Sequence, residues 1–154
     1  MQRSDYRTEN CSVARTLEIV GERWALLILR EAFLGVKRFD QIQGNLGIAR
    51  NILADRLQRL VGAGILERRR YQERPKRYEY RLTQMGLDLY PALVAIMEWG
   101  DRYVSDKAGA PLVLEHVDCG KETTPRFVCS ECGEPIHARN VRPKLGPGAL
   151  RKTA

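Results

Sequence analysis

Residues 38–63 read RFDQIQGNLGIARNILADRLQRLVGA, and this stretch decides the fold. Its first six residues form a short amphipathic segment, and Gly-Asn-Leu-Gly at 44–47 has the composition of a turn. Residues 49–63 then carry one apolar stripe at the spacing of an α-helix. The apolar positions are Phe39 and Ile42 in the first segment, and Ile52, Leu53, Leu57, Leu60 and Val61 in the second. A short helix, a turn and a longer helix make the helix-turn-helix arrangement, although a plain helical hairpin would give the same pattern.

A basic hairpin is predicted directly after these helices. Residues 65–71 are a strand candidate, residues 72–76 a turn, and residues 77–82 alternate aromatic or apolar with charged side chains as a half-buried strand does. Residues 68–81 hold seven basic and two acidic side chains, so they carry five of the seven net positive charges of the chain. A charge run is usually a solvated face, but a basic hairpin behind two such helices favours contact with phosphates or a minor groove.

The flanking segments predict further helices. Apolar periodicity indicates helices at 12–20 and at 24–34, the second of them apolar on most sides. Thr83 has the residue type of an N-cap for a long helix at about 84–105, in which Pro91 marks either a kink or the real start. This long helix has more apolar side chains than one small domain covers easily. We therefore expect it to face a partner subunit as well, the alternative being a wholly intramolecular core.

The predicted fold class is α+β, mainly α: a winged helix-turn-helix with a long dimerisation helix and a small ribbon-like C-terminal extension. We expect four parts along the chain. These are a flexible N-terminus (1–10), a DNA-binding and dimerisation domain (11–106), a Cys/His zinc-ribbon-like extension (107–141) and a flexible tail (142–154).

The composition limits the classes of protein to which the chain can belong. The 154 residues are 44% hydrophobic, enough for a real core, and the net charge of +7 favours polyanionic partners. We find no apolar run long enough to span a membrane and no pattern of a signal peptide, so we expect a cytoplasmic protein with reduced, metal-bound or redox-active cysteines. Paired carboxylates, a glycine-rich phosphate loop and a Ser-His-Asp set are all missing from the sequence, so we do not expect an enzyme.

Short motifs in a fixed order link these segments to a known family. They are Cys11-Ser12-Val13-Ala14, Gly21-Glu22-Arg23-Trp24, Arg38-Phe39-Asp40-Gln41-Ile42, Gly47-Ile48-Ala49, Leu53-x-x-Arg56-Leu57, Gly64-Ile65-Leu66-x-Arg68, Tyr78-x-Tyr80-x-Leu82-Thr83-x-x-Gly86, and Pro91 to Trp99. No single motif is specific, but the set is. Over residues 11–104 the chain resembles the HxlR family of winged-helix regulators, which are relatives of the MarR type.

The resemblance implies a homodimer that binds a pseudo-palindromic DNA operator, and a regulator, here expected to be a repressor, that responds to a reactive small molecule or a redox signal. It places Arg50 and Asn51 at the start of the recognition helix, where they would reach base edges. The remaining DNA contacts that it implies are Arg38, Arg56, Arg74, Lys76 and Arg77. For Arg38 and Arg56 the alternative is a structural salt bridge.

One position departs from the family pattern. Ala49 stands where the family usually has Ser or Thr, a residue that caps the recognition helix and can bind phosphate. With alanine there, the cap or the docking must be made by other groups.

Cys11 precedes the first predicted helix. In redox-sensing branches of the family that the chain resembles, a cysteine here is the sensor, and a helix N-terminus or nearby cations can activate such a thiol. The alternative is a small, partly buried apolar residue. Our hypothesis is that Cys11 responds to oxidants.

Two Cys/His pairs mark the extension. Nine residues lie between Cys119 and Cys129 in the sequences His116-x-x-Cys119-Gly120 and Cys129-x-x-Cys132-Gly133, and each sequence ends in a glycine that permits a tight turn. Four such ligands suit a tetrahedral structural Zn²⁺, with His137 as a spare ligand. Cys129 and Cys132 could instead form a dithiol switch.

Two other classes of protein remain open at this point. A zinc-ribbon protein that binds RNA or associates with RNA polymerase would also carry a basic hairpin and paired Cys/His ligands. A thiol redox enzyme would use Cys129 and Cys132, but it needs a substrate pocket that the sequence does not indicate.

Overall fold

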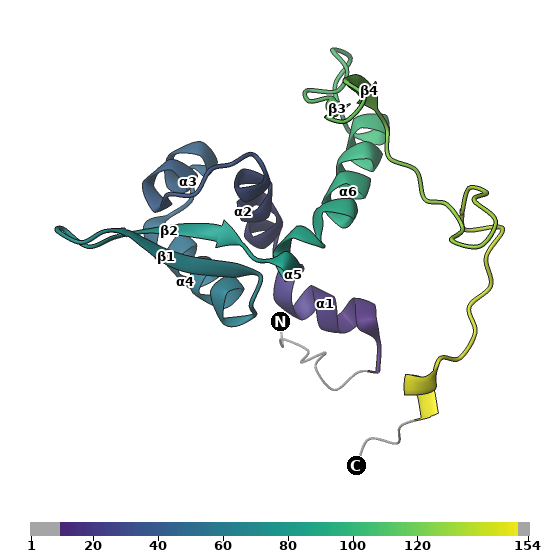
Figure 1. Ribbon diagram of the computed structural model, residues 1–154, viewed down its shortest axis with the longest axis horizontal. Helices are drawn as coiled ribbons and strands as arrows, with labels where there is room; N and C mark the ends of the chain where they lie inside the picture. Colours follow the sequence, from purple (N-terminus) through teal and green to yellow (C-terminus); the bar gives the residue numbers. More distant parts are fainter. Residues whose placement is uncertain (1–9, 151–154) are drawn as a thin grey trace. The chain divides into compact units, whose positions relative to one another are not determined.

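The computed structural model describes residues 10–150, and within it the chain divides into two compact units, residues 1–93 and 94–154 (Figure 1). The expected flexible N-terminus therefore lies almost wholly outside the described residues, as does the end of the expected tail. No helix in the described range is long and apolar enough to cross a membrane.

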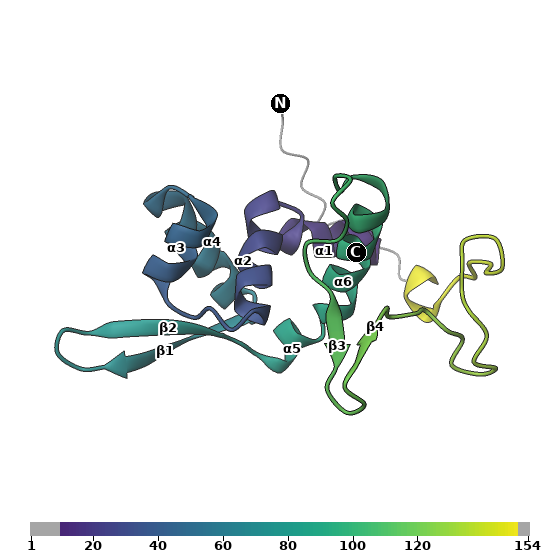
Figure 2. The same ribbon diagram turned by 90° about the horizontal axis from the view of Figure 1, so that it is seen from above.

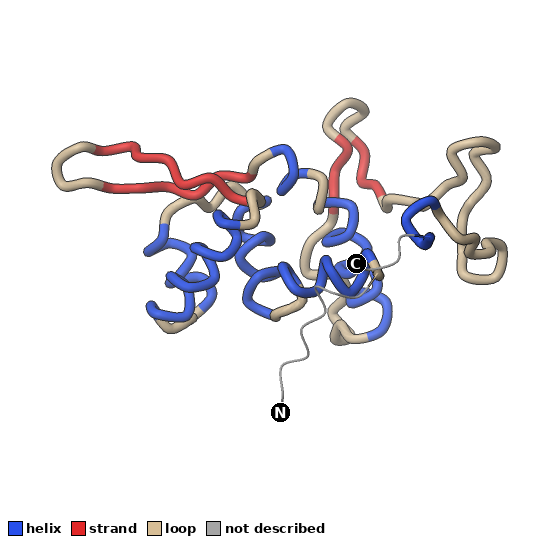
Figure 3. The backbone as a smooth tube through the Cα atoms, turned by 90° about the horizontal axis from the view of Figure 1, so that it is seen from below, coloured by secondary structure: helices blue, strands red, loops and turns tan. Residues whose placement is uncertain are grey.

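The first unit consists of helices followed by a two-stranded hairpin, the wing. Its elements are α1 (Ser12–Val20), α2 (Arg23–Phe33), α3 (Phe39–Leu46), α4 (Arg50–Gly62), β1 (Leu66–Gln72), β2 (Arg77–Leu82) and α5 (Gln84–Leu87). The tube drawing shows the two strands of the wing reaching away from the helices (Figure 3). The predicted winged helix-turn-helix fold is confirmed, with α3 and α4 as its two characteristic helices.

One core holds the first unit together. The apolar faces of α2, α3, α4 and the base of β1 meet in this core, and eight of its large side chains are at most 2% exposed. They are Ile28, Leu29, Ile42, Leu53, Leu57, Leu60, Ile65 and Leu66. Full burial of such a side chain contributes about 1.5–3 kcal/mol, so this cluster fixes how α4 lies against α2 and α3.

The turn between α3 and α4 lies later in the chain than predicted. We expected it at 44–47, but α3 continues to Leu46 and ends at Gly47, whose φ of 60° is left-handed. Asn45 holds the last turn of α3 in place, because its side-chain amide donates to the carboxylate of Glu31 on α2 at 2.7 Å. Glu31 is almost fully buried and also accepts from Arg30 at 2.7 Å.

The wing is an antiparallel pair with Leu66 opposite Leu82 at its base and Arg70 opposite Tyr78 further out. A register shift between Arg70 and Gln72 precedes the tip. The loop before α3 is attached to this hairpin, since the backbone N–H of Tyr80 donates to the carbonyl of Lys37 at 2.8 Å. The wing is therefore attached to the chain at the start of α3, and Figure 2 shows its two strands extending past the helices of the first unit.

The single helix predicted at 84–105 is wrong, because the structure has two helices there. Thr83 caps the first, α5, by accepting from the N–H of Gly86, as expected. The helix is then interrupted, and α6 (Tyr90–Tyr103) begins after two residues outside either helix. Pro91 explains the break, since it has no N–H to continue the hydrogen bonds of α5 but is tolerated in the first turn of a helix. Of the two readings of Pro91, a helix start is the correct one.

The second unit takes in most of α6 and the C-terminal extension. It contains β3 (Leu114–His116), β4 (Lys121–Thr123) and a short 3₁₀ helix (Pro147–Leu150). The two strands pair antiparallel, with His116 opposite Lys121. Between residues 104 and 149 only Leu114 and Cys129 are even half-buried, so the extension has almost no apolar core.

Candidate nucleic-acid interface

The N-terminus of the recognition helix α4 is exposed and lacks a side-chain cap. Ala49 is its N-cap residue and offers no hydrogen bond, so the first N–H groups of the helix have no side-chain acceptor within the described residues. Arg50 begins the helix with a side chain that is 74% exposed. It is held loosely, with its guanidinium 3.6 Å from Asp40 and 4.9 Å from the ring centre of Phe39. Asn51 is also exposed.

Arg38 lies at the junction of α3 and the wing. It is the N-cap residue of α3, and its backbone forms an isolated β-bridge with Glu79 of β2. Its exposed guanidinium stands 4.7 Å from the ring centre of Tyr71 on β1. Since Arg38 lies over an aromatic ring and forms no ion pair in the described part of the chain, its charge is available to an external anion. The expected alternative, a structural salt bridge at Arg38, is not what the structure shows.

The tip of the wing carries a group of exposed cations. Arg74, Lys76 and Arg77 are all exposed, and within residues 10–150 none of them pairs with a carboxylate. Two other arginines of the hairpin are paired, Arg70 with Glu73 in the turn at 3.0 Å and Arg81 with Glu79 on β2 at 2.6 Å. Among the described residues the hairpin therefore keeps three unpaired cations at its tip, although part of its positive charge is neutralised.

Arg56 is placed differently from the other predicted contacts. Its side chain is only 19% exposed, and its Nε donates to Glu22 Oε2 at 2.8 Å while Nη1 pairs with Asp55. The hydrogen bond to Glu22 raises the pKa of Arg56 above its ordinary value. Glu22 also caps α2 by accepting from the N–H of Trp24 at 3.2 Å. This geometry favours the structural alternative, in which Arg56 attaches α4 to the start of α2.

Arg69 is a candidate contact that the sequence analysis counted only as part of a charge run. Residues that pair on neighbouring strands point to the same face of a sheet, and Arg69 lies opposite Glu79, which is itself bridged to Arg38. Arg69 is exposed and forms no ion pair within the described range. The sequence offered no signal for this grouping, because only the structure shows that the loop before α3 joins β2 at Glu79.

Cys11 is the N-cap residue of α1 and is exposed. A thiol in this place is accessible to reagents, and the partly buried alternative does not apply to it.

The paired Cys/His residues of the extension form two local turns. In the first, the sulfur of Cys119 lies 3.4 Å from Nδ1 of His116. In the second, the N–H groups of Cys132 and Glu131 donate to the sulfur of Cys129 and lower the pKa of that thiol, with a further contribution from the Cys132 thiol. Each predicted pair is therefore brought together. Among the described residues, however, no group of three or more His, Cys, Asp or Glu gathers around one point. The spare ligand His137 has its Nδ1 occupied by the N–H of Arg139 at 3.3 Å.

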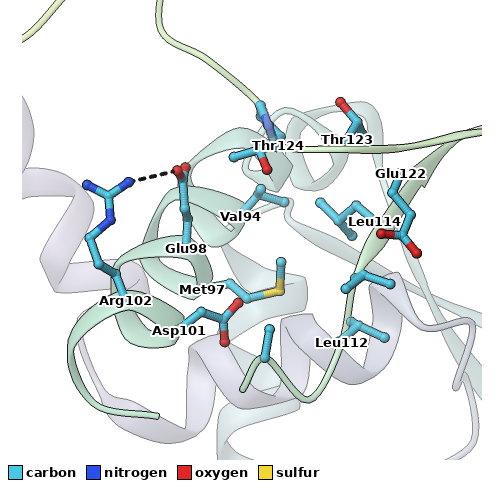
Figure 4. A pocket seen from close by; sticks show the side chains of 13 residues that line it. Val94, Met97, Glu98, Asp101, Arg102, Leu112, Leu114, Glu122, Thr123 and Thr124 are labelled. Atoms are coloured by element: carbon cyan, nitrogen blue, oxygen red, sulfur yellow. Dashed lines mark hydrogen bonds and ion pairs between the residues drawn. The ribbon is translucent and has the colours of Figure 1, made fainter. Parts of the chain in front are cut away.

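A hollow of about 640 Å³ lies within the second unit, between α6 and the β3–β4 hairpin (Figure 4). Val94, Met97 and Leu114 contribute apolar surface. Glu98, on the same wall, pairs with Arg102 at 3.5 Å, which leaves the carboxylates of Asp101 and Glu122 without a cation within the described residues. The negative charge of the hollow therefore favours a cationic or uncharged ligand over an anion. No local pattern in the sequence predicts this hollow, because its walls come from separate segments of the chain.

Comparison with known proteins identifies the arrangement. The model of the HxlR-like helix-turn-helix family matches residues 19–108, more than half of the chain. The chain belongs to this family. As an HxlR-like protein it is a transcription regulator with a helix-turn-helix domain, and the resemblance stated above is confirmed.

Three similar proteins show how far the likeness extends. An uncharacterized HTH-type transcriptional regulator of Mycobacterium tuberculosis is 52% identical over 149 residues, which cover 97% of this chain and 94% of that protein. The crystal structure of a candidate transcription factor matches with a TM-score of 0.81 and 36% identity, over 90% of this chain and 97% of that one. The reduced form of the redox regulator HypR matches with a TM-score of 0.57 and 31% identity, over 61% of this chain and 96% of HypR. The first two thus include the extension, whereas HypR matches a shorter part.

Proposed function

We propose that this HxlR-like regulator binds a specific double-stranded DNA operator as a homodimer and represses transcription there. The observation that carries the proposal is the joint surface of α4, α3 and the wing. An uncapped helix start with Arg50 and Asn51 exposed lies in the same unit as Arg38 and as three wing-tip cations without carboxylate partners. Such a surface matches a major groove read by the helix, with phosphate or minor-groove contacts beside it.

The roles divide by residue type. Arg50 and Asn51 have the donor and acceptor groups that discriminate bases, and each good bidentate contact contributes about 1–3 kcal/mol of discrimination. The N–H groups at the start of α4 suit a phosphate oxygen, which would supply the cap that Ala49 lacks. Arg38, Arg69, Arg74, Lys76 and Arg77 carry charge without sequence information, so we assign them to phosphates or the minor groove.

The test compares binding of the purified protein to its own promoter region and to an unrelated duplex across a salt series. We expect a preference for the promoter that survives moderate salt and is lost in an Arg50→Ala, Asn51→Ala double variant. Arg59→Ala is the matched control, because Arg59 is an exposed arginine on the same helix that pairs with Asp55. Equal binding to both duplexes that disappears with salt would show charge attraction alone and contradict the proposal.

The dimer rests on two exposed apolar helix faces. On α1, Val13 and Leu17 are one turn apart and 67% and 55% exposed. On α6, Ile96, Trp99 and Tyr103 follow one another at helical spacing and are 53%, 59% and 64% exposed. The occupant we propose is a second copy of the chain, as the family resemblance implies, since a twofold axis would bury the same faces on both protomers.

Analytical ultracentrifugation tests the dimer directly. Leu17→Glu and Trp99→Glu should each convert the protein to a monomer at concentrations where the parent is dimeric. Leu34→Glu is the control, because Leu34 is similarly exposed (57%) at the end of α2 and outside both faces. If both charged variants sediment like the parent, the two faces are not the interface.

For the effector we propose oxidation at Cys11. The exposed thiol at the start of α1 and the likeness to a redox regulator support this assignment. Oxidant should release the operator from the parent protein but not from Cys11→Ser, whereas Cys132→Ser should respond like the parent. Release that is unchanged in Cys11→Ser would remove Cys11 from the mechanism and leave a small-molecule effector, for which the hollow of the second unit is a candidate cavity.

A further inference from the structure

The hollow of the second unit lies between one face of α6 and the segment that follows this helix. Its α6 wall consists of residues three or four positions apart, which share a helix face: Val94, Met97, Glu98, Asp101 and Arg102. The other wall comes from residues 110–114 and 122–125, which include parts of β3 and β4, and Figure 4 shows the two walls facing each other. The volume of about 640 Å³ falls within the range of small-molecule sites, about 300–1,000 Å³.

The apolar surface of the hollow suits the body of an organic ligand. Met97 on α6 is half-buried, and methionine has a flexible side chain whose sulfur makes favourable contacts with aromatic rings. On the opposite wall Leu112 and Val113 are 46% and 59% exposed. A ligand that covers these side chains removes apolar surface from water, which favours binding.

The charge of the hollow differs in sign from that of the whole chain. Three carboxylates and one guanidinium line it, whereas the net charge of the chain is +7. Glu98 and Arg102 offset each other at 3.5 Å. Asp101 accepts from the hydroxyl of Ser105 at 3.3 Å, and neither Asp101 nor Glu122 pairs with a cation within residues 10–150. Two negative charges therefore remain available to a ligand.

The pairing of β3 with β4 also favours a cation. Glu122 lies directly opposite Glu115, and both side chains are exposed. Like charges in directly opposite positions destabilise an antiparallel pair. This hairpin consists of only three residue pairs, so it has little other pairing to offset the repulsion. A positive group beside Glu122 would reduce the repulsion, so ligand binding and the hairpin would stabilise each other.

We propose that this hollow binds a small organic cation with an aromatic body. Its positive group faces the carboxylates of Asp101 and Glu122, and its body covers Met97 and Leu112. The same carboxylates repel an organic anion, and an inorganic cation would leave the apolar wall uncovered. The family model ends at residue 108, so the second wall lies outside the family domain. Such a cation is the class of small-molecule effector that the regulator would take, and in this respect the inference rests on the proposed function.

Fluorescence of dansyl probes measures this binding in the full-length protein without DNA. Dansylcadaverine has an aromatic body and an amine that is protonated at neutral pH, while its N-acetyl derivative keeps the body without the charge. We expect the cation to bind at least about fivefold more tightly than the acetylated probe, and this ratio to fall below about twofold in an Asp101→Asn, Glu122→Gln double variant. The matched control is a Glu131→Gln, Glu134→Gln double variant. It removes two exposed carboxylates outside the hollow and should keep the ratio of the parent.

A second pair of variants locates the probe in the hollow. Leu112→Ser should weaken both probes by about threefold, because it removes apolar wall without changing the charge. Leu145→Ser, at a residue that is 87% exposed and outside the hollow, should leave both affinities unchanged.

Three results would overturn the proposed site: no binding of either probe, equal binding of the two probes to the parent, or a preference for the cation that survives in the Asp101→Asn, Glu122→Gln variant. None of them bears on operator binding, because the assay contains no DNA. Equally, a failure of operator binding would leave the probe measurements unaffected.

Discussion

Replacing Arg56 by glutamine should destabilise the first unit without changing the electrostatic part of DNA binding. The guanidinium is 19% exposed and donates to Glu22 at 2.8 Å, and Glu22 in turn caps α2. A hydrogen bond between charged groups contributes about 1.5–3 kcal/mol, whereas an exposed pair contributes about 0–1 kcal/mol. The Glu22 side chain is 38% exposed and can regain water, so we place the loss near the lower limit, at about 1.5 kcal/mol.

Urea unfolding followed by circular dichroism measures this loss. With a slope of about 1.5 kcal/mol per molar urea, the midpoint of the transition should fall by about 1 M. Arg59→Gln is the control, since Arg59 pairs with Asp55 at 2.9 Å but is 56% exposed, and it should lose less than about 0.5 kcal/mol. Both variants remove one positive charge from α4, so the difference between their unfolding free energies isolates the contact of Arg56 with Glu22.

The same two variants test the alternative role in DNA binding. A lost phosphate contact lowers the slope of log affinity against log salt by about 0.9, whereas a structural arginine leaves the slope unchanged. An Arg56→Gln protein that unfolds like Arg59→Gln but shows a flatter salt dependence would refute the structural assignment and restore Arg56 as a phosphate contact.

Three further results follow from particular contacts. Lys76→Gln at the wing tip should reduce the salt slope by about 1 without altering the preference for the promoter, as measured by fluorescence anisotropy; an altered preference would mean that Lys76 reads bases. Burial acts to raise the pKa of Glu31, but the hydrogen bonds from Asn45 and Arg30 outweigh it and keep the pKa below 4.5. Glu31 therefore stabilises the fold fully above about pH 4.5 and loses this contribution as the pH falls through its lower folded pKa, so urea titrations of Glu31→Gln should show a weaker acid dependence than the parent. Gly86→Ala should cost about 1–3 kcal/mol because a Cβ there would overlap the carbonyl oxygen of Ile65, whereas Gly62→Ala, with open space around it, should stabilise α4 by up to about 1 kcal/mol. Equal melting temperatures for the two glycine variants would contradict that comparison.

The sequence predicted best the elements whose residues repeat at a regular spacing. The apolar stripe of α4 and the alternation of β2 both come from burial on one face, and the structure has helix Arg50–Gly62 and strand Arg77–Leu82 where they were expected. The turn before α4 was placed too early because Gly44 and Asn45 are typical turn residues. Asn45 instead bonds to Glu31, fourteen residues away, and a contact at that separation leaves no local pattern.

The candidate interface also contains residues that local sequence predicts and residues whose role depends on distant contacts. Exposed residues at element ends, such as Arg50 and Lys76, could be assigned from position alone, because a helix start and a hairpin tip reach solvent in any winged fold. The role of Arg56 depends on Glu22, a partner 34 residues earlier in the chain, so its type and position on α4 suggested a DNA contact that the structure does not favour. Arg69 was missed for a similar reason, since its significance comes from its place opposite Glu79, which is bridged to Arg38 from a distant segment of the chain.

The departure at Ala49 connects stability to DNA binding. A Ser or Thr cap typically contributes about 1 kcal/mol to a helix, and α4 forgoes it. The helix is held instead by burial of Ile48 just before it and of Leu53 and Leu57 within it, which are 3%, 0% and 0% exposed. Because packing fixes the helix, its first N–H groups can stay unbonded by side chains in the free protein. A phosphate oxygen placed there gains hydrogen bonds that no internal group has to release, so the missing cap favours the bound state over the free one.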